Sequence, residues 1–258
     1  MKILISNDDG VDAEGINQLY SELKKQHEVF VVAPQTEMSG AGSSITTKRP
    51  LSILKIKENF ISVSGTPVDC VHLALNEICP FKPDLLLSGI NYGANMAEDL
   101  LYSGTVGAAL EAREFGVPSI AISAAAFNQP GSDKRIEPNF FSASKVSCDL
   151  VNKLSKLKIE SQLILNINIP NLDYEKITKF KLTQPGTWGK RNPPNKEVTD
   201  SGKERFWITH RSKVPKNKED TDIATLARGE VSICSIGPNF SIKETDNQLA
   251  SWVGSLNL

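Results

Sequence analysis

Cysteine and histidine are scarce in this sequence of 258 residues, and neither occurs in a pattern that would hold a soft metal ion. The four cysteines form no C-x-x-C pair, and no histidine lies at zinc-finger spacing from them. Three cysteines fall in apolar segments, which favours buried free thiols in a reducing compartment over disulfides. The three histidines are far apart in the sequence, and none lies near the loops that carry the candidate site residues. We therefore do not expect a histidine to act as general base.

A strong charge of one sign and a long hydrophobic run are missing as well. The formal net charge is −1 and the sequence pI is near 6.3, so no basic field would attract the backbone of a long nucleic acid. The first apolar run, at residues 3–5, is followed almost at once by Asp8 and Asp9, which is too soon for a signal peptide or a membrane span. We therefore expect a cytoplasmic protein that binds a small ligand and has no membrane or nucleic-acid partner.

Familiar nucleotide-binding and hydrolase motifs are also absent. The sequence contains no G-x-x-x-x-G-K-[ST] loop and no G-x-G-x-x-G fingerprint, which removes the main support for a nucleoside triphosphate or dinucleotide site. It also contains no G-x-S-x-G elbow, the usual setting of a nucleophilic serine in an α/β hydrolase.

Strand-like and helix-like segments do alternate regularly along the first two thirds of the chain. Mostly apolar runs occur at 2–6, 28–33, 84–88, 119–123 and 163–169, and the run at 84–88 has no polar alternation, as expected for a parallel strand that helices cover on both faces. Stripes at helical spacing begin near residues 16, 66, 105 and 140, and residues 51–64 resemble a hairpin. This order predicts an α/β fold with a doubly wound, mostly parallel, Rossmann-like sheet.

The character of the chain changes after about residue 183. Residues 184–222 contain many Lys, Asn and Pro and few apolar runs, with aromatic residues at Trp188, Phe206 and Trp207. We predict a protruding β-hairpin arm there, followed by a strand at 230–236 that returns to the core. The sequence thus divides into an α/β catalytic core at 1–183 and an arm with a C-terminal segment at 184–258.

Ligands of an open α/β sheet bind outside the carboxyl ends of its strands, and the loop after the first strand contains two adjacent carboxylates. Asp8 and Asp9 would repel each other in a cleft of low dielectric constant, and a bound cation is the simplest way to keep both ionised. A simpler interpretation is that one aspartate caps a helix and the other lies in a turn. Taken alone, the Asp8-Asp9 pair supports this interpretation and a cation site about equally.

Two further loops at this edge carry polar residues. Residues 35–44 offer hydroxyls and backbone amides between glycines, although this loop could equally be a flexible connector. Residues 88–105 end in Ser103-Gly104-Thr105 at the start of a helix, where free N–H groups and the positive end of the helix dipole suit a phosphate. An ordinary helix cap explains that tripeptide as well. Together, the three loops supply hard oxygen ligands for Mg²⁺, Mn²⁺ or Ca²⁺ beside an anion site, which indicates phosphoryl transfer to water.

Several longer motifs occur in one order along the chain: ILISNDDG at 3–10, VVAP at 31–34, GTPVDC at 65–70, SGIN at 88–91, SGTV at 103–106 and PSIAIS at 118–123. In these motifs the chain resembles the SurE survival-protein family of 5′/3′-nucleotidases. The resemblance is nearly continuous over residues 1–125 and patchier beyond them. It implies hydrolysis of nucleoside 5′- and 3′-monophosphates to nucleoside and phosphate and, in some relatives, of short polyphosphate.

The resemblance also implies roles for individual residues. The implied ligands of one divalent cation per subunit are Asp8, Asp9, Ser39 and Asn91. The implied lining of the phosphate pocket is Asn95, Ser103, Gly104 and Thr105. Catalysis would then rest on Asp8, Asp9, Asn95 and Ser103. In relatives the arm and the C-terminal segment pack or exchange between subunits, which implies a homodimer or homotetramer here.

Two other classes of function stay open on the sequence alone. One is a nucleotide- or phosphate-sensing module that uses the same pocket without turnover, for which AMP would bind without release of phosphate. The other is a serine-dependent acyl hydrolase, which would lose activity on substitution of Ser39 or Ser103 and would be insensitive to a chelator.

Overall fold

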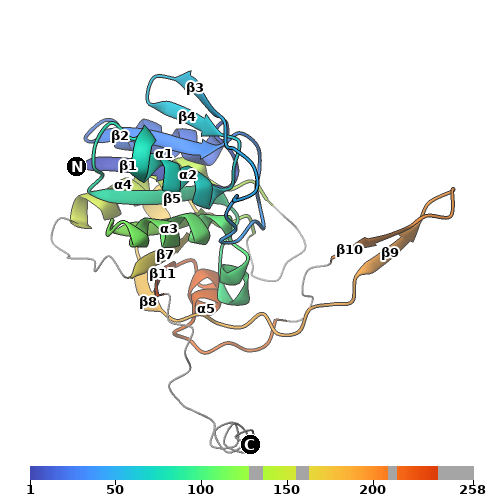
Figure 1. The fold of residues 1–258 in the computed structure, drawn as a ribbon. Coiled ribbons are helices and arrows are strands. Elements are labelled where there is room, and N and C mark those ends of the chain that lie inside the picture. Colours follow the sequence, from blue (N-terminus) through green and yellow to red (C-terminus); the bar gives the residue numbers. More distant parts are fainter. Residues whose placement is uncertain (128–135, 155–162, 209–213, 238–258) are drawn as a thin grey trace, which may run out of the picture.

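A nine-stranded sheet forms the body of the protein in the computed structural model, which describes residues 1–127, 136–154, 163–208 and 214–237 (Figure 1). Its strand order is β3-β4-β2-β1-β5-β6-β7-β11-β8. The six central strands are mutually parallel: β4 (Phe60–Val63), β2 (Glu28–Pro34), β1 (Lys2–Ser6), β5 (Leu85–Tyr92), β6 (Ser119–Ala124) and β7 (Ile164–Ile169). Antiparallel pairing occurs only next to the edges of this sheet, where β3 (Ile53–Lys57) adds to β4 and β11 (Val231–Ile236) adds to β7, with β8 (Phe180–Thr183) parallel to β11.

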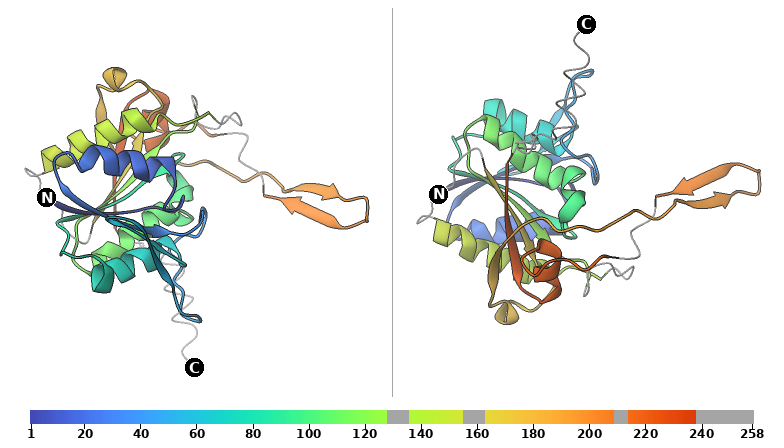
Figure 2. Two further views of the ribbon diagram at one scale, coloured as in Figure 1. Left: turned by 90° about the horizontal axis from the view of Figure 1, so that it is seen from above. Right: turned by 90° about the horizontal axis from the view of Figure 1, so that it is seen from below.

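Helices cover both faces of the sheet, as expected for strands that are buried on both sides (Figure 2). The helices on one face are α1 (Glu14–Leu23) and α4 (Phe140–Leu154), and those on the other are α2 (Pro67–Leu73) and α3 (Gly104–Glu114). Alternate residues of β1 serve the two cores: Ile3 and Ile5 pack with the α1 and α4 side, and Leu4 packs with the α2 and α3 side. Shorter helical turns are η1 (Ala74–Ile78), η2 (Ala97–Leu101), η3 (Tyr174–Lys176) and α5 (Asp222–Ala227).

The winding of the sheet reverses between β1 and β5. From β1 the chain builds outward through β2 to β4, and from β5 it builds in the opposite direction through β6 to β7. Connections that diverge to the two sides of a pair of neighbouring strands leave a crevice outside their carboxyl ends. The loops that follow β1 and β5 therefore meet at the position where the sequence predicts a ligand.

The predicted α/β class and the mostly parallel sheet are confirmed, and three differences refine them. The strand predicted at 84–88 continues to Tyr92 as β5, because its ladder with β6 shifts register between Ser88 and Asn91 and then resumes. Strand β8 and helix α5 were not predicted, since each is very short and its sequence has too few residues to show a period. Asn91 consequently lies on a strand and not in a loop.

The arm is the hairpin of β9 (Asn195–Val198) and β10 (Glu204–Trp207), which projects from the body (Figure 1). Its base is closed by backbone hydrogen bonds, since Gln184 N donates to Asp220 O at 3.1 Å and Asp222 N donates to Gln184 O at 3.0 Å. The carboxylate of Asp222 accepts from Ala97 N at 2.9 Å, which ties this base to η2. The C-terminal segment expected to join subunits, residues 238–258, lies outside the described residues. No helix in the described ranges has the length and apolar character needed to span a membrane.

Candidate metal and phosphate site

The loop after β1 holds its two aspartates in a fixed turn. Asn7 Nδ2 donates to Gly10 O at 2.8 Å, and Gly10 has a φ of +102°, a value that favours glycine. Met38 N donates to Asp8 O at 2.7 Å, so the loop after β2 lies against the same turn. Asp8 is buried, with 3% of its surface exposed. The pair is thus part of the folded crevice and not an open surface turn.

Asp8 is also in direct contact with the start of α3. The Thr105 hydroxyl donates to Asp8 Oδ1 at 2.6 Å. A Cβ at Gly104 would lie 2.8 Å from Asp8 Cβ, a distance that real Cβ atoms essentially never show, so glycine is what lets the helix approach. Ser103 is the N-cap, and its Oγ accepts from Val106 N at 3.1 Å. The predicted metal ligand and the predicted phosphate-binding helix terminus are therefore joined by a hydrogen bond.

Asp9 is held by the end of β5. Tyr92 N donates to Asp9 Oδ2 at 2.9 Å, which places Asn91, the preceding residue, beside the aspartate pair. Asn91 is buried, and its Nδ2 donates to Gly93 O at 2.8 Å. This hydrogen bond orients the side-chain amide. It uses Nδ2 and not Oδ1, the atom that can bind a cation. Three of the four implied metal ligands therefore gather where β1 and β5 end.

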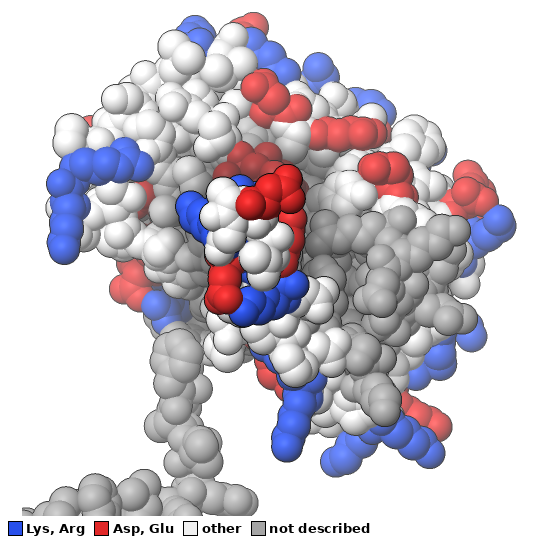
Figure 3. All heavy atoms as spheres, turned by 90° about the vertical axis from the view of Figure 1, so that its right-hand side faces the viewer, with Lys and Arg blue, Asp and Glu red and all other residues white. Residues whose placement is uncertain are grey.

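The electrostatics of this group suit a hard cation. Burial, and then the charges of Asp8 and Glu37, raise the pKa of Asp9 to about 7. Burial also raises the pKa of Asp8, although hydrogen bonds from Thr105 and the backbone of Gly104 offset part of this effect. Among the described residues, no three His, Cys, Asp or Glu side chains cluster to hold a metal, so a cation here would need neutral oxygens such as that of Asn91. In Figure 3, acidic atoms are visible in the hollow behind the arm on this side of the molecule.

Ser39, the fourth implied ligand, is exposed and its hydroxyl donates to Glu37 Oε1 at 2.9 Å. The structure places it on the loop that contacts Asp8 through Met38, but the hydrogen bond of its own side chain goes to Glu37 and not to the aspartates. This loop is not a free connector, because Gly42 N donates to Tyr102 O at 3.0 Å next to α3. Glu37, which the sequence analysis did not single out, does not form a cluster with the two aspartates, but its charge contributes to the raised pKa of Asp9.

The far end of the same loop is held by Asp69 at the start of α2. Asp69 Oδ1 accepts from Thr46 N and its Oδ2 accepts from Thr66 N, both at 2.9 Å, and the Thr66 side chain accepts from Asp69 N in return. This reciprocal pair is a capping box, with Thr66 at the N-cap and Pro67 at the first position of the helix that the sequence predicted to begin near residue 66. Burial alone would raise the pKa of Asp69, but the hydrogen bonds from Thr46 and Thr66 outweigh it and hold this pKa below 3.8.

Replacing Asp69 by Asn should therefore destabilise the protein in a manner that depends on pH. A carboxylate whose folded pKa is lowered contributes stability above its unfolded pKa and loses that contribution as the pH falls through the folded value. We expect a loss of about 1 kcal/mol in the free energy of unfolding near neutral pH, as for loss of a helix cap. Urea unfolding from pH 7 to pH 3 measures the difference, with exposed Asp173→Asn as the control. A difference that grew toward low pH would contradict this account.

The side chain of Asn95 lies between Asp8 and the neighbouring strands. Its Nδ2 donates to Ser123 Oγ at 2.9 Å and to Thr105 Oγ1 at 3.4 Å. Its backbone is held by two residues of β7, Asn166 and Asn168. The four residues implied for the phosphate pocket are therefore brought together, although Thr105 uses its hydroxyl hydrogen on Asp8 in this structure.

Comparison with known proteins agrees with this arrangement. The family described as Survival protein SurE matches residues 3–192, which include every residue of the candidate site. The chain belongs to the SurE family. A protein of Pseudomonas putida named 5′-nucleotidase SurE is 40% identical over 253 residues, which are 98% of each chain. A SurE nucleotidase of Stenotrophomonas maltophilia is 37% identical over 259 residues, covering 100% of this chain and 97% of the relative.

The fold agrees with that of a solved SurE structure as well. The crystal structure of the SurE protein from Aquifex aeolicus matches with a TM-score of 0.83 and 38% sequence identity, covering 99% of both chains. The structural match thus extends past residue 192 to the arm and the returning strand.

Sequence analysis of this SurE chain missed three polar residues that support the site: Ser123, Asn166 and Asn168. Each is fully buried on a central strand, where a parallel sheet normally carries apolar side chains. The signal was present in the run ILNINI of β7, since two asparagines two positions apart face the same side of a buried strand.

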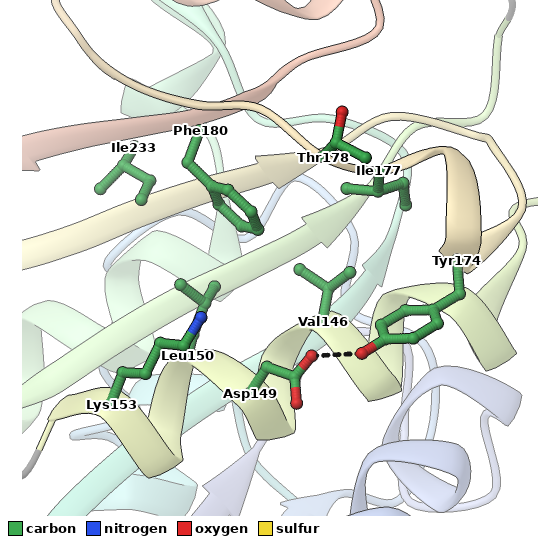
Figure 4. Close-up of a pocket in the computed structure, with 9 residues that line it drawn as sticks. All are labelled: Val146, Asp149, Leu150, Lys153, Tyr174, Ile177, Thr178, Phe180 and Ile233. Atoms are coloured by element: carbon green, nitrogen blue, oxygen red, sulfur yellow. Dashed lines mark hydrogen bonds between the residues drawn. The ribbon is translucent and has the colours of Figure 1, made fainter.

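A second hollow, of about 340 Å³, lies between α4, η3 and β8 and shares no residue with the acidic site (Figure 4). Its walls include Val146, Leu150 and Phe180, and the Tyr174 hydroxyl donates to Asp149 across one end. No pair of acidic groups lies next to a helix N-terminus there, so this hollow lacks the features expected of a phosphate site in the SurE fold.

Proposed function

We propose that this SurE-family chain hydrolyses nucleoside 5′- and 3′-monophosphates to nucleoside and phosphate, with one divalent cation per subunit. The observation that carries the proposal is the hydrogen bond from Thr105 to Asp8, which joins a buried carboxylate and its neighbour Asp9 to the first turn of α3. A cation site and an anion-binding helix terminus in contact are the elements that hydrolysis of a phosphate ester needs. Relatives at about 40% identity that carry the name 5′-nucleotidase support the 5′ activity.

The cation would be held by Asp8, Asp9 and Asn91, and by Ser39 if its hydroxyl turns away from Glu37. All four offer oxygen atoms, which suits Mg²⁺, Mn²⁺ or Ca²⁺. A cation bound there would neutralise phosphate oxygens and lower the pKa of a water molecule, which supplies the nucleophile.

The residues of the chain itself would bind and orient the ester. The Ser103 hydroxyl accepts from Val106 N and retains its own hydrogen to donate to a phosphate oxygen. Asn95 Nδ2 lies within reach of both Thr105 and Ser123 and could turn toward a second phosphate oxygen. The positive end of the α3 dipole favours the phosphate charge. The bond from phosphorus to the ester oxygen breaks, a bond from phosphorus to the water oxygen forms, and the released nucleoside oxygen takes up a proton.

A panel of substrates tests the proposal directly. Phosphate release should be measured from the four 5′-ribonucleoside monophosphates, 3′-AMP and short polyphosphate, with Mg²⁺, Mn²⁺ and Ca²⁺ in turn. We expect release from the 5′- and 3′-monophosphates with at least one of these cations. Binding of AMP without release under every condition would contradict the proposal and would favour the sensing module.

Two further features of the chain remain proposals. All candidate site residues fall within residues 1–183, which supports the division into a catalytic core and a second part at 184–258. The arm exposes Phe206 and Trp207, each with more than half of its surface accessible, which supports assembly as a homodimer or homotetramer. The mass of the protein in solution, measured by light scattering, tests that assembly.

A further inference from the structure

A buried polar cluster lies on β6 and β7, on the face that α3 also covers. Asn166 and Asn168 of β7 are fully buried, and they pair in register with Ala121 and Ser123 of β6. A buried side-chain amide without hydrogen bonds costs about 1–3 kcal/mol, so two of them in a central strand need specific partners.

The side-chain amides of both asparagines form hydrogen bonds with the main chain of one residue, Asn95. Asn168 Oδ1 accepts from Asn95 N at 2.8 Å, and Asn168 Nδ2 donates to Asn95 O at 2.9 Å. Asn166 Nδ2 also donates to Asn95 O at 2.9 Å. Asn168 therefore holds both main-chain polar groups of Asn95, whereas Asn166 holds only the carbonyl, which it shares.

The side chain of Asn95 continues this network toward the carboxylates. Its Nδ2 donates to Ser123 and Thr105, and the Thr105 hydroxyl donates to Asp8. An unbroken series of hydrogen bonds thus runs from Asn168 on β7 to Asp8 at the end of β1. A side chain held through its own backbone has fewer orientations. Both polar groups of the Asn168 side chain are hydrogen-bonded, whereas Asn166 Oδ1 has no partner among the described residues.

We propose that Asn168 is a positioning residue for the hydrolysis, which acts by clamping the main chain of Asn95 and so fixing the Asn95 side chain beside Thr105 and Asp8. This inference rests on the proposed function, because it assigns Asn168 to that same site. Asn168 touches neither the phosphate nor the cation in this account. Its contribution is to remove motion from a residue that does, and misplacement of a catalytic group by about 1 Å can cost about 100-fold in rate.

The test compares Asn168→Ala, Asn95→Ala and the double variant in the full-length protein. We expect Asn168→Ala to lower kcat for AMP by about 30- to 100-fold with little change in KM. In the Asn95→Ala background the same change should have no further effect on kcat, because the group that Asn168 positions is gone. Ile167→Val is the matched control, since Ile167 is buried on the same strand between the two asparagines and should keep wild-type kcat.

A second readout does not depend on turnover. Hydrogen exchange of the segment around Asn95, followed by mass spectrometry in the absence of any cation, should speed up in Asn168→Ala and not in Ile167→Val. If Asn168→Ala is too unstable to assay, Asn168→Leu keeps most of the packed volume while removing both hydrogen bonds. Wild-type kcat in the Asn168 variants, or losses that multiply in the double variant, would overturn the inference. Absence of hydrolysis by the wild-type protein would instead overturn the proposed function, and hydrogen exchange would still decide whether the clamp exists.

Discussion

Replacing Asp8 by Asn should lower kcat for hydrolysis of nucleoside monophosphates by about 10²- to 10³-fold, the range for loss of one preorganised electrostatic contact. Asn keeps the shape of the side chain and can still accept the hydrogen bond from Thr105, but it removes the charge that would bind the cation. The fold should survive, since burial disfavours the charged form of Asp8 and a neutral side chain in its place avoids that cost.

Steady-state kinetics and a thermal unfolding curve in cation-free buffer measure the two halves of this prediction. Asp12→Asn is the matched control, because Asp12 is exposed and follows in the same loop. We expect Asp12→Asn to retain wild-type kcat and Asp8→Asn to unfold at or above the wild-type temperature. Substantial turnover by Asp8→Asn would remove this aspartate from the mechanism.

Removing divalent cations with a chelator should abolish hydrolysis, and adding back Mg²⁺, Mn²⁺ or Ca²⁺ should restore it. The cation should also stabilise the fold, because it relieves the repulsion between the neighbouring carboxylates of Asp8 and Asp9. A ligand present at about 100 times its Kd adds about 2.7 kcal/mol to the free energy of unfolding, which is easily measured as a rise in Tm.

Substitution of one aspartate distinguishes specific binding from a general salt effect. Asp9→Asn should lose most of the cation-dependent rise in Tm, whereas Asp12→Asn should show the full rise. Activity that persisted after exhaustive chelation would contradict a metal site and would reopen the serine hydrolase hypothesis for Ser39 and Ser103.

The sequence predicted the fold well where local chemistry is strong. The helix that starts at Thr66 has its capping box, its N1 proline and its apolar stripe within a few residues, and the structure begins it there. The sequence also shows most of the buried strands as apolar runs. The reversal of winding between β1 and β5 explains why Asn91 lies beside Asp8 and Asp9, although more than 80 residues separate it from them.

Other features depended on contacts that a linear pattern does not contain. The continuation of β5 to Tyr92 results from a register shift in its pairing with β6. The hydroxyl of Ser39 donates to Glu37, a contact that its motif does not specify. Asn168 is a polar residue in a mostly apolar run. Its hydrogen bonds to the main chain of Asn95 form only because the loop that contains Asn95 packs against β7 in the folded protein.

The closed base of the arm has a consequence for how this protein can vary. Gln184 directly follows β8, and it pairs with Thr221 and Asp222 at the start of α5, the helix that precedes β11. Strands β8 and β11 are themselves neighbours in the sheet. When a segment leaves and returns at one place, the entropic cost of closing it grows only slowly with its length. The hairpin can therefore be shortened or lengthened with little effect on the sheet, so that the sequence of the arm can change independently of the residues that line the crevice.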